Sequence, residues 1–223
     1  MGLMKNVLSY SKRKFFKYSQ QRLDYQFQHN KWDWLENLDE LPRYSLLTGY
    51  HRFHNLGGSV LDLGCGQGLL LKRFAPSDYS SYLAVDYSAA AIKQIPISEK
   101  VEAIEADLTT FVPPSQFDSI IFNESLYYVK KPVEQVRRYL DFLTSKGLLF
   151  TSIHTRKNFE LVDELKKNFE VVDETTVVNK WGETWSCLTI RKATINVGIL
   201  MSFMLELFLE TLMNFVEPAA SIL

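Results

Sequence analysis

The fold of this 223-residue chain is decided by residues 60–68, VLDLGCGQG. The apolar run that opens this stretch is typical of a buried strand. Three glycines follow at alternate positions, Gly64, Gly66 and Gly68, and a ligand can approach a glycine backbone closely because it has no Cβ atom. Residues 69–74 then have the pattern of a helix start, whose free N–H groups would face the same ligand. Strand, glycine turn and helix together predict a nucleotide-type pocket.

The spacing of the glycines narrows the kind of ligand. The pattern is G-x-G-x-G, whereas the dinucleotide fingerprint is G-x-G-x-x-G, so a bound pyrophosphate is disfavoured. Asp62 stands at the end of the strand, where its carboxylate would repel phosphates. The stretch therefore favours a cationic or amine-bearing ligand.

Three further apolar runs end in polar groups: residues 81–86, 101–107 and 117–124. Each polar end falls at the carboxyl end of an expected strand, which is where ligands sit in open α/β sheets. These ends bring Asp86, Asp107, Asn123 and Glu124 to one edge of the sheet.

At this point the chain resembles the class I S-adenosylmethionine-dependent methyltransferases, because residues 61–68, LDLGCGQG, match the first motif of that family. The resemblance covers roughly residues 56–192 and implies S-adenosyl-L-methionine as the cofactor. It implies that Asp86 binds the ribose hydroxyls, that Asp107 and Leu108 lie beside the adenine, and that Asn123 and Glu124 face the methyl group and the acceptor. The predicted cofactor-binding residues are Arg43, Asp62, Gly64, Cys65, Gly66, Gly68, Asp86, Tyr87, Asp107, Leu108 and Asn123.

Two of these acids also have a purely structural interpretation. A carboxylate can accept two hydrogen bonds from a diol, which suits Asp86 to a ribose. The alternative for Asp86 is to cap the helix that begins near residue 88, although Ser88 could fill that position itself. The alternative for Asp107 is a turn, since residues 107–110, DLTT, have the composition of one.

Methyl transfer from a sulfonium requires an aligned acceptor and, where the acceptor carries a proton, a base to take it. His154, Glu124 and Tyr128 are the catalytic candidates, because they follow the expected strands at the same edge. The alternatives are an ordinary loop histidine and a packing aromatic. Residues 123–129, NESLYYV, also resemble a loop of the nodulation protein S type of N-methyltransferase. We therefore expect transfer to an N or O atom of a small polar metabolite, such as a sugar or a specialised metabolite.

The fold class expected from the whole pattern is α/β. It is a doubly wound, mostly parallel seven-stranded sheet with an antiparallel C-terminal hairpin and helices on both faces, the Rossmann-like methyltransferase fold. Residues 132–143 and 158–167 have helical spacing, and residues 148–153 read as the fifth strand. Strands at 169–178 and 184–191, joined by the loop 179–183, form the hairpin.

Three segments are expected: an N-terminal helical lid at 1–55, a cofactor-binding core at 56–192 and an apolar C-terminal helix or tail at 193–223. The first 22 residues are basic and carry no acid. Arg43 could pair with the methionine carboxylate of the cofactor or remain a solvated helix charge. Trp34 and Tyr44 are predicted to belong to the core of the lid.

The C-terminal residues 195–216 are crowded with apolar side chains. Glu206 and Glu210 interrupt them one helical turn apart, which disfavours a membrane span because two carboxylates at mid-bilayer are costly. We expect a helix that binds a protein partner or a second copy of the chain, with peripheral membrane contact as the alternative.

Composition limits the other function classes. The net charge of −1 gives no support to a nucleic-acid partner. Cys65 and Cys187 form no metal-binding pattern, and free thiols without a secretory signal indicate the cytoplasm. Two rival functions remain: a catalytically silent methyltransferase-like interaction module, and a nicotinamide-dependent oxidoreductase, which the glycine spacing disfavours.

Overall fold

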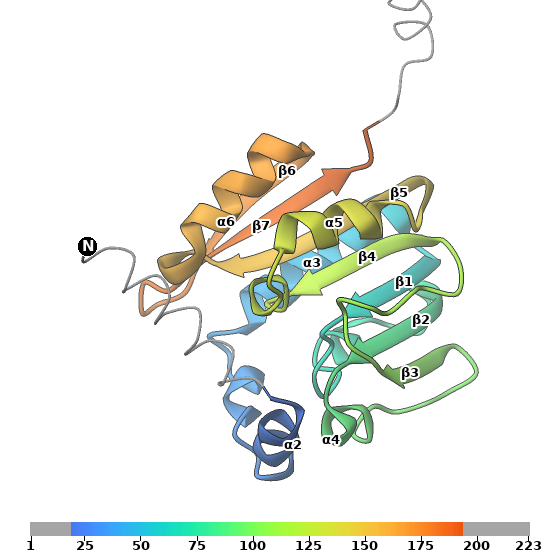
Figure 1. The fold of residues 1–223 in the computed structure, drawn as a ribbon, viewed down its shortest axis with the longest axis vertical. Helices are drawn as coiled ribbons and strands as arrows, with labels where there is room; N and C mark the ends of the chain where they lie inside the picture. Colours follow the sequence, from blue (N-terminus) through green and yellow to red (C-terminus); the bar gives the residue numbers. More distant parts are fainter. Residues whose placement is uncertain (1–18, 194–223) are drawn as a thin grey trace, which may run out of the picture. The chain divides into compact units, whose positions relative to one another are not determined.

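The computed structural model describes residues 19–193, and those up to Lys192 form one compact unit. Seven strands make a single sheet in the order β3-β2-β1-β4-β5-β7-β6 (Figure 1). The strands are β1 (Gly58–Leu63), β2 (Tyr79–Asp86), β3 (Val101–Glu105), β4 (Phe117–Asn123), β5 (Leu143–His154), β6 (Glu170–Val178) and β7 (Thr184–Arg191).

The first five strands pair in parallel, and β7 lies antiparallel between β5 and β6. The chain winds outward from β1 to β3 and then returns to β4, so the strand order reverses between β1 and β4. In such a sheet the ligand crevice opens at the carboxyl ends of the strands beside this reversal. The predicted fold class, including the antiparallel hairpin, is confirmed.

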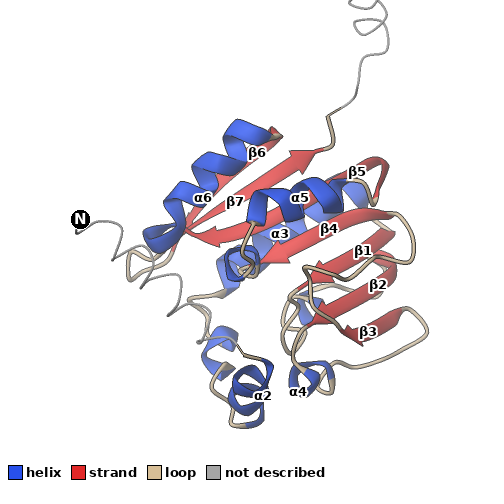
Figure 2. Cartoon of the chain, in the orientation of Figure 1, coloured by secondary structure: helices blue, strands red, loops and turns tan. Residues whose placement is uncertain are grey.

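Helices cover both faces of the sheet (Figure 2). One apolar core packs α5 and α6 against the front face, and a second packs α3 against the back. The helices and 3₁₀ turns of the described residues are α2 (Gln20–Gln28), η1 (Asp33–Glu36), α3 (Leu41–Asn55), η2 (Leu71–Arg73), α4 (Ala89–Ile92), η3 (Leu126–Tyr128), α5 (Pro132–Leu140) and α6 (Thr155–Asn168).

A buried histidine fastens α3 to the sheet. One ring nitrogen of His51, Nε2, donates to the carbonyl of Asp78 at 2.7 Å, and the other lies 2.8 Å from the hydroxyl of Ser119. Burial lowers the pKa of His51, which keeps the ring neutral. This fixes the helix that carries Arg43, one of the predicted site residues.

Two predicted elements differ from the structure. The helix expected at residues 69–74 is wrong: the chain makes only the short turn η2, because Pro76 follows closely and the residue before a proline is kept out of the helical region. The helix expected to reach residue 143 ends at Leu140, and β5 begins at Leu143 instead. Gly147 therefore lies inside β5, where a Cβ atom would come within 2.8 Å of the carbonyl of Phe117.

The two ends of the chain lie outside the described residues. The basic segment before residue 19 and the predicted apolar helix or tail at 195–216 are therefore not described, and the three-segment division stays a prediction. Within residues 19–193 no helix is both long and apolar enough to cross a membrane.

Candidate functional site

The glycine turn needs glycine at all three positions. Gly64, Gly66 and Gly68 have φ values of +78°, +56° and +75°, a region that other residues rarely adopt. At Gly64 a Cβ atom would also lie 2.3 Å from the Cβ of Ser125, because the loop after β4 packs directly on the turn. The backbone of the turn is therefore close to the ends of both β1 and β4.

Asp86 ties this turn to the end of β2. Its carboxylate accepts hydrogen bonds from the backbone N–H groups of Gly66 and Ser88, each at 2.8 Å. Burial raises its pKa, and the backbone hydrogen bonds oppose that shift. Ser88 caps α4 itself by accepting from the N–H of Ala91 at 3.2 Å. The side chain of Asp86 is thus not the cap of that helix.

Asp62 is completely buried below the turn. Its Oδ2 accepts from the hydroxyl of Tyr82 at 2.7 Å, whereas its Oδ1 has no hydrogen-bond partner among the described residues. Burial raises the pKa of Asp62 to about 7, with Tyr82 opposing and Asp86 adding to the shift. A buried carboxylate oxygen without a partner is costly, which makes this atom a ready acceptor for a donor on a ligand.

Helix α2, which lies within the predicted N-terminal lid segment, covers the same region. Asp24 accepts from the hydroxyl of Ser88 and, at 3.1 Å, from the N–H of Ala90. The ring of Phe27 lies 3.6 Å from where a Cβ of Gly66 would be. No motif predicts the individual contacts of α2, because they join residues more than 60 positions apart. The one sign of them in the sequence is that Asp24 is the first acid of the chain.

The side chain of Asp107 stabilises the turn after β3, which is the structural role given above as the alternative to binding the cofactor. Its Oδ1 accepts from the N–H of Thr109 at 2.8 Å and from the hydroxyl at 2.7 Å. Leu108 is buried, and its carbonyl accepts from Arg138 at 2.7 Å and from Tyr139 at 2.8 Å. Near the glycine turn, Tyr87 is partly exposed, and Cys65 is a half-buried free thiol.

Arg43 is not a solvated charge, since only 1% of it is exposed. Its guanidinium donates to Glu40 at 3.0 Å, to the side-chain oxygen of Asn123, and to the hydroxyl of Tyr44 at 3.1 Å. Tyr44 is buried as predicted, but Trp34 is 50% exposed and lies outside the core. Helix α3 thus brings a buried cation to the end of β4.

Glu124 is the first residue after β4 and has φ of +58°, a strained value for a residue other than glycine. Its carboxylate accepts from the hydroxyl of Tyr127 at 2.8 Å and from that of Ser152 at 3.2 Å. Burial raises its pKa, and the charge of Arg43 opposes that shift. Tyr128, the third catalytic candidate, is 41% exposed and contacts the Tyr127 ring at 4.7 Å between centroids.

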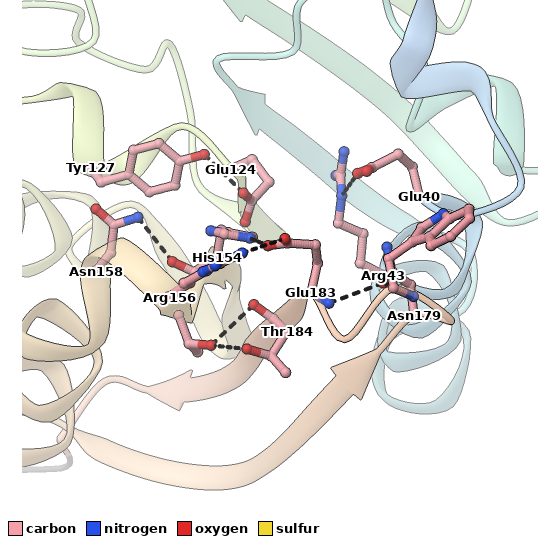
Figure 3. A network of polar contacts seen from close by, with 12 residues as sticks. Glu40, Arg43, Glu124, Tyr127, His154, Arg156, Asn158, Asn179, Glu183 and Thr184 are labelled. Atoms are coloured by element: carbon pink, nitrogen blue, oxygen red, sulfur yellow. Dashed lines mark hydrogen bonds and ion pairs between the residues drawn. The ribbon is translucent and has the colours of Figure 1, made fainter.

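His154 is the last residue of β5 and lies beside Glu124 (Figure 3). Its Nε2 is 2.7 Å from Glu183, which lies 29 residues later in the loop between β6 and β7. Arg156 donates to the other oxygen of Glu183 at 2.9 Å. Sequence reasoning missed Glu183 because no motif marks it and the hairpin alone brings it to His154.

The described residues contain no group of His, Cys, Asp and Glu side chains that could hold a metal ion. The site instead has two parts at one edge of the sheet. The glycine turn with Asp62 and Asp86 can receive a ligand rich in hydrogen-bond donors. The second part, which we call the mouth, consists of Arg43, Glu124 and His154. It lies next to the glycine turn and can bind a second, polar molecule.

Comparison with known proteins identifies a family for this arrangement. A family model described as a methyltransferase domain matches residues 30–213. The (S)-coclaurine N-methyltransferase of Thalictrum flavum subsp. glaucum is 31% identical over 119 residues, 48% of this chain. The match spans 33% of that enzyme's own length.

Solved structures share the fold at low identity. The N-methyltransferase NodS of Bradyrhizobium japonicum WM9, in complex with S-adenosyl-L-homocysteine, is 16% identical with a TM-score of 0.67 over 78% of this chain and 98% of that one. The 1,6-didemethyltoxoflavin-N1-methyltransferase of Burkholderia thailandensis, with bound 1,6-didemethyltoxoflavin and S-adenosylhomocysteine, is 17% identical. Its TM-score is 0.64 over 78% of this chain and 87% of that one.

A first prediction concerns the glycine turn. Gly64→Ala should lower the free energy of unfolding by ~3 kcal/mol or more, because left-handed strain of ~1–2 kcal/mol adds to a steric clash of ~1–3 kcal/mol. Gly182→Ala is the matched control: its φ is +76°, but nothing lies within 4 Å of the added Cβ. Urea denaturation should show a loss of only ~1–2 kcal/mol there. Equal losses in the two variants would contradict the close packing of Ser125 on the turn.

A second prediction follows from the buried charge of Asp62. Because its pKa is raised to about 7 in the folded chain, the protonated form stabilises the fold at low pH, and this contribution is lost as pH rises through 7. Asp62→Asn should therefore raise the Tm of the ligand-free protein above pH 7, and the gain should shrink as pH falls towards 4. Thermal melts from pH 4 to 8.5 measure this. A gain that grows on acidification would show that the carboxyl is not protonated in the fold.

Proposed function

The chain belongs to the methyltransferase domain family, and on that premise we propose that it transfers a methyl group from S-adenosyl-L-methionine to a nitrogen atom of a small molecule. The observation that carries the proposal is that the glycine turn, with the carboxylate of Asp86 bonded to it, lies beside the partly buried carboxylate of Glu124 at the neighbouring strand end.

The residues around the glycine turn fit this cofactor. The unpartnered Oδ1 of Asp62 suits the ammonium group of the methionine part, since a buried carboxylate favours a cation. Asp86 would bind the ribose hydroxyls, because a carboxylate has about four lone-pair sites and the backbone N–H groups around it do not fill all of them. Arg43 would pair with the methionine carboxylate, and Asp107 and Leu108 would lie beside the adenine. When bound, the cofactor supplies an electrophilic methyl group on a sulfonium.

A nitrogen acceptor is favoured over a hydroxyl or a sugar. The curated relative and both structural neighbours named above are N-methyltransferases by name. In this chain the mouth holds two carboxylates, Glu40 and Glu124, around the single guanidinium of Arg43. Such a mouth attracts an acceptor that carries N–H donors or a positive charge.

Glu124 would align the acceptor. Its carboxylate can accept a hydrogen bond from the N–H of an amine and so direct the nitrogen lone pair at the methyl carbon. Tyr127 and Ser152 hold this carboxylate from two sides, so its position is set before the acceptor arrives. Tyr128 lies more exposed at the rim, where it can contact the rest of the acceptor.

The rival functions make different predictions. A nicotinamide-dependent oxidoreductase would need a pyrophosphate-binding turn, which the G-x-G-x-G spacing does not provide. A silent interaction module would bind the cofactor without transferring the methyl group. A cytoplasmic location, the absence of nucleic-acid binding, and a partner or membrane contact through the C-terminal segment stay predictions.

Asp86→Ala should weaken binding of S-adenosyl-L-homocysteine at least ~10-fold, because a hydrogen bond to a charged group contributes ~1.5–3 kcal/mol. Isothermal titration calorimetry measures the Kd. Asp86→Asn is the companion variant, since it keeps the size of the side chain that supports Gly66. Asp141→Ala, which removes a surface ion pair with Lys192, is the control and should leave the Kd unchanged. An unaltered Kd in both Asp86 variants removes this residue from the site.

Glu124→Gln should lower kcat for methyl transfer to a panel of primary and secondary amines by ~100-fold, the loss expected when a reacting group is misplaced by about 1 Å. The glutamine keeps the shape, its oxygen can accept from one of the two hydroxyls, and its NH2 group can donate to the other, so the fold and the Kd for S-adenosyl-L-homocysteine should not change. Release of labelled methyl product measures kcat. Transfer to hydroxyl compounds in place of amines would overturn the nitrogen assignment, and cofactor binding without any transfer would favour the silent module.

A further inference from the structure

The contact between His154 and Glu183 fixes the protonation pattern of the imidazole. Glu183 accepts from Nε2 at 2.7 Å, and a carboxylate has no proton to give, so Nε2 must carry the hydrogen. A neutral ring protonated at Nε2 leaves Nδ1 as an acceptor. Among the described residues Nδ1 makes no hydrogen bond.

We propose that Glu183 is a positioning residue that holds His154 with its free Nδ1 towards the acceptor, and that His154 is the base that takes the proton of the amine. The proposal rests on the proposed N-methylation and assigns a separate task to each side chain. Glu124 aligns the nitrogen, His154 accepts the proton, and Glu183 orients the ring.

The loop is built to keep Glu183 in place. The N–H of Glu183 donates to the side chain of Asn179 at 3.0 Å, and the N–H of Asn179 donates back to the carbonyl of Glu183 at 3.0 Å. Gly182 permits this closed loop because its φ is +76°. The hydroxyl of Thr155 donates to the carbonyl of Thr184 at 3.1 Å, which fastens the loop to the start of α6. These contacts explain how a loop residue can hold a fixed position (Figure 3).

The ring of His154 is held from a second side. Trp185 meets it edge to face, with 5.5 Å between the ring centroids and 71° between the planes. The charged groups that face this histidine are Glu183 from the hairpin loop and Glu124 from the end of β4, while Arg156 of α6 reaches it only through Glu183. Two carboxylates therefore lie beside this one imidazole.

The step balances without any further reactant. The lone pair of the amine nitrogen forms the new N–C bond as the C–S bond of the sulfonium breaks, and the sulfur keeps that electron pair. The nitrogen loses one proton to Nδ1 of His154, and the imidazolium later releases it to water. The products are the methylated amine and S-adenosyl-L-homocysteine.

The test compares Glu183→Ala, His154→Ala and the double variant. Glu183→Ala should lower kcat ~10-fold or more with no change in the Kd for S-adenosyl-L-homocysteine, because the ring of His154 is no longer held in its orientation towards the acceptor. The double variant should be no slower than His154→Ala alone, since the two residues act as one unit. Glu174→Ala is the control: it removes a carboxylate on the same hairpin that pairs with Lys166, and it should leave kcat and the NMR signal of His154 unchanged.

A readout independent of activity comes from NMR. The chain has four histidines, and the hydrogen-bonded Nε2–H of His154 should give a downfield, slowly exchanging proton signal that disappears in Glu183→Ala. A signal that persists in that variant, or additive losses in the double variant, would each overturn the proposal. Should no amine be methylated by the wild-type protein, the proposed function fails and the catalytic role of His154 fails with it; the NMR signal then still shows whether Glu183 holds the ring.

Discussion

The hydrogen bond from the backbone N–H of Gly66 to the carboxylate of Asp86 is the contact on which the site depends. It joins the left-handed glycine turn after β1 to the end of β2, across the parallel pair that lies beside the reversal of strand order. The same carboxylate accepts from the N–H of Ser88, which begins the segment that α2 covers. One buried acid therefore orders the turn and the start of α4, Asp24 fastens α2 over them, and any ligand there meets an arrangement already formed.

That order has a thermodynamic cost in the ligand-free chain. Asp62 and Asp86 are both buried, burial raises the pKa of each, and Asp62 keeps one oxygen without a partner. Buried charges of the same sign destabilise a fold unless a cation or a set of donors compensates them. Retaining both is consistent with a ligand that brings those donors. Stability and binding are thus opposed at this site, as is common where function requires an unsatisfied group.

The sequence predicted the strands, the glycine turn and the C-terminal hairpin, because short runs of neighbouring residues determine them. Apolar runs ending in polar groups gave the strands, the glycines gave the turn, and the antiparallel hairpin followed from two alternating runs around residues 179–183. Two helix predictions were wrong. Pro76 prevents a helix after the glycine turn, and the helix expected to reach residue 143 ends earlier because β5 begins at Leu143. The burial of Arg43 and the approach of Glu183 to His154 could not be predicted either, because side chains far apart in sequence create those environments and no periodicity records them.

The loop of the β6–β7 hairpin contacts both sides of the mouth. At the tip of the hairpin, Trp181 donates its indole N–H to Asp39 at 2.8 Å. The next residue in the chain, Glu40, accepts a hydrogen bond from Arg43. The same loop carries Glu183, which holds His154. A single loop is therefore bonded both to the segment that positions the cation and to His154. Because this loop is closed by the two hydrogen bonds between Asn179 and Glu183, it holds both contacts in one fixed arrangement before any ligand binds.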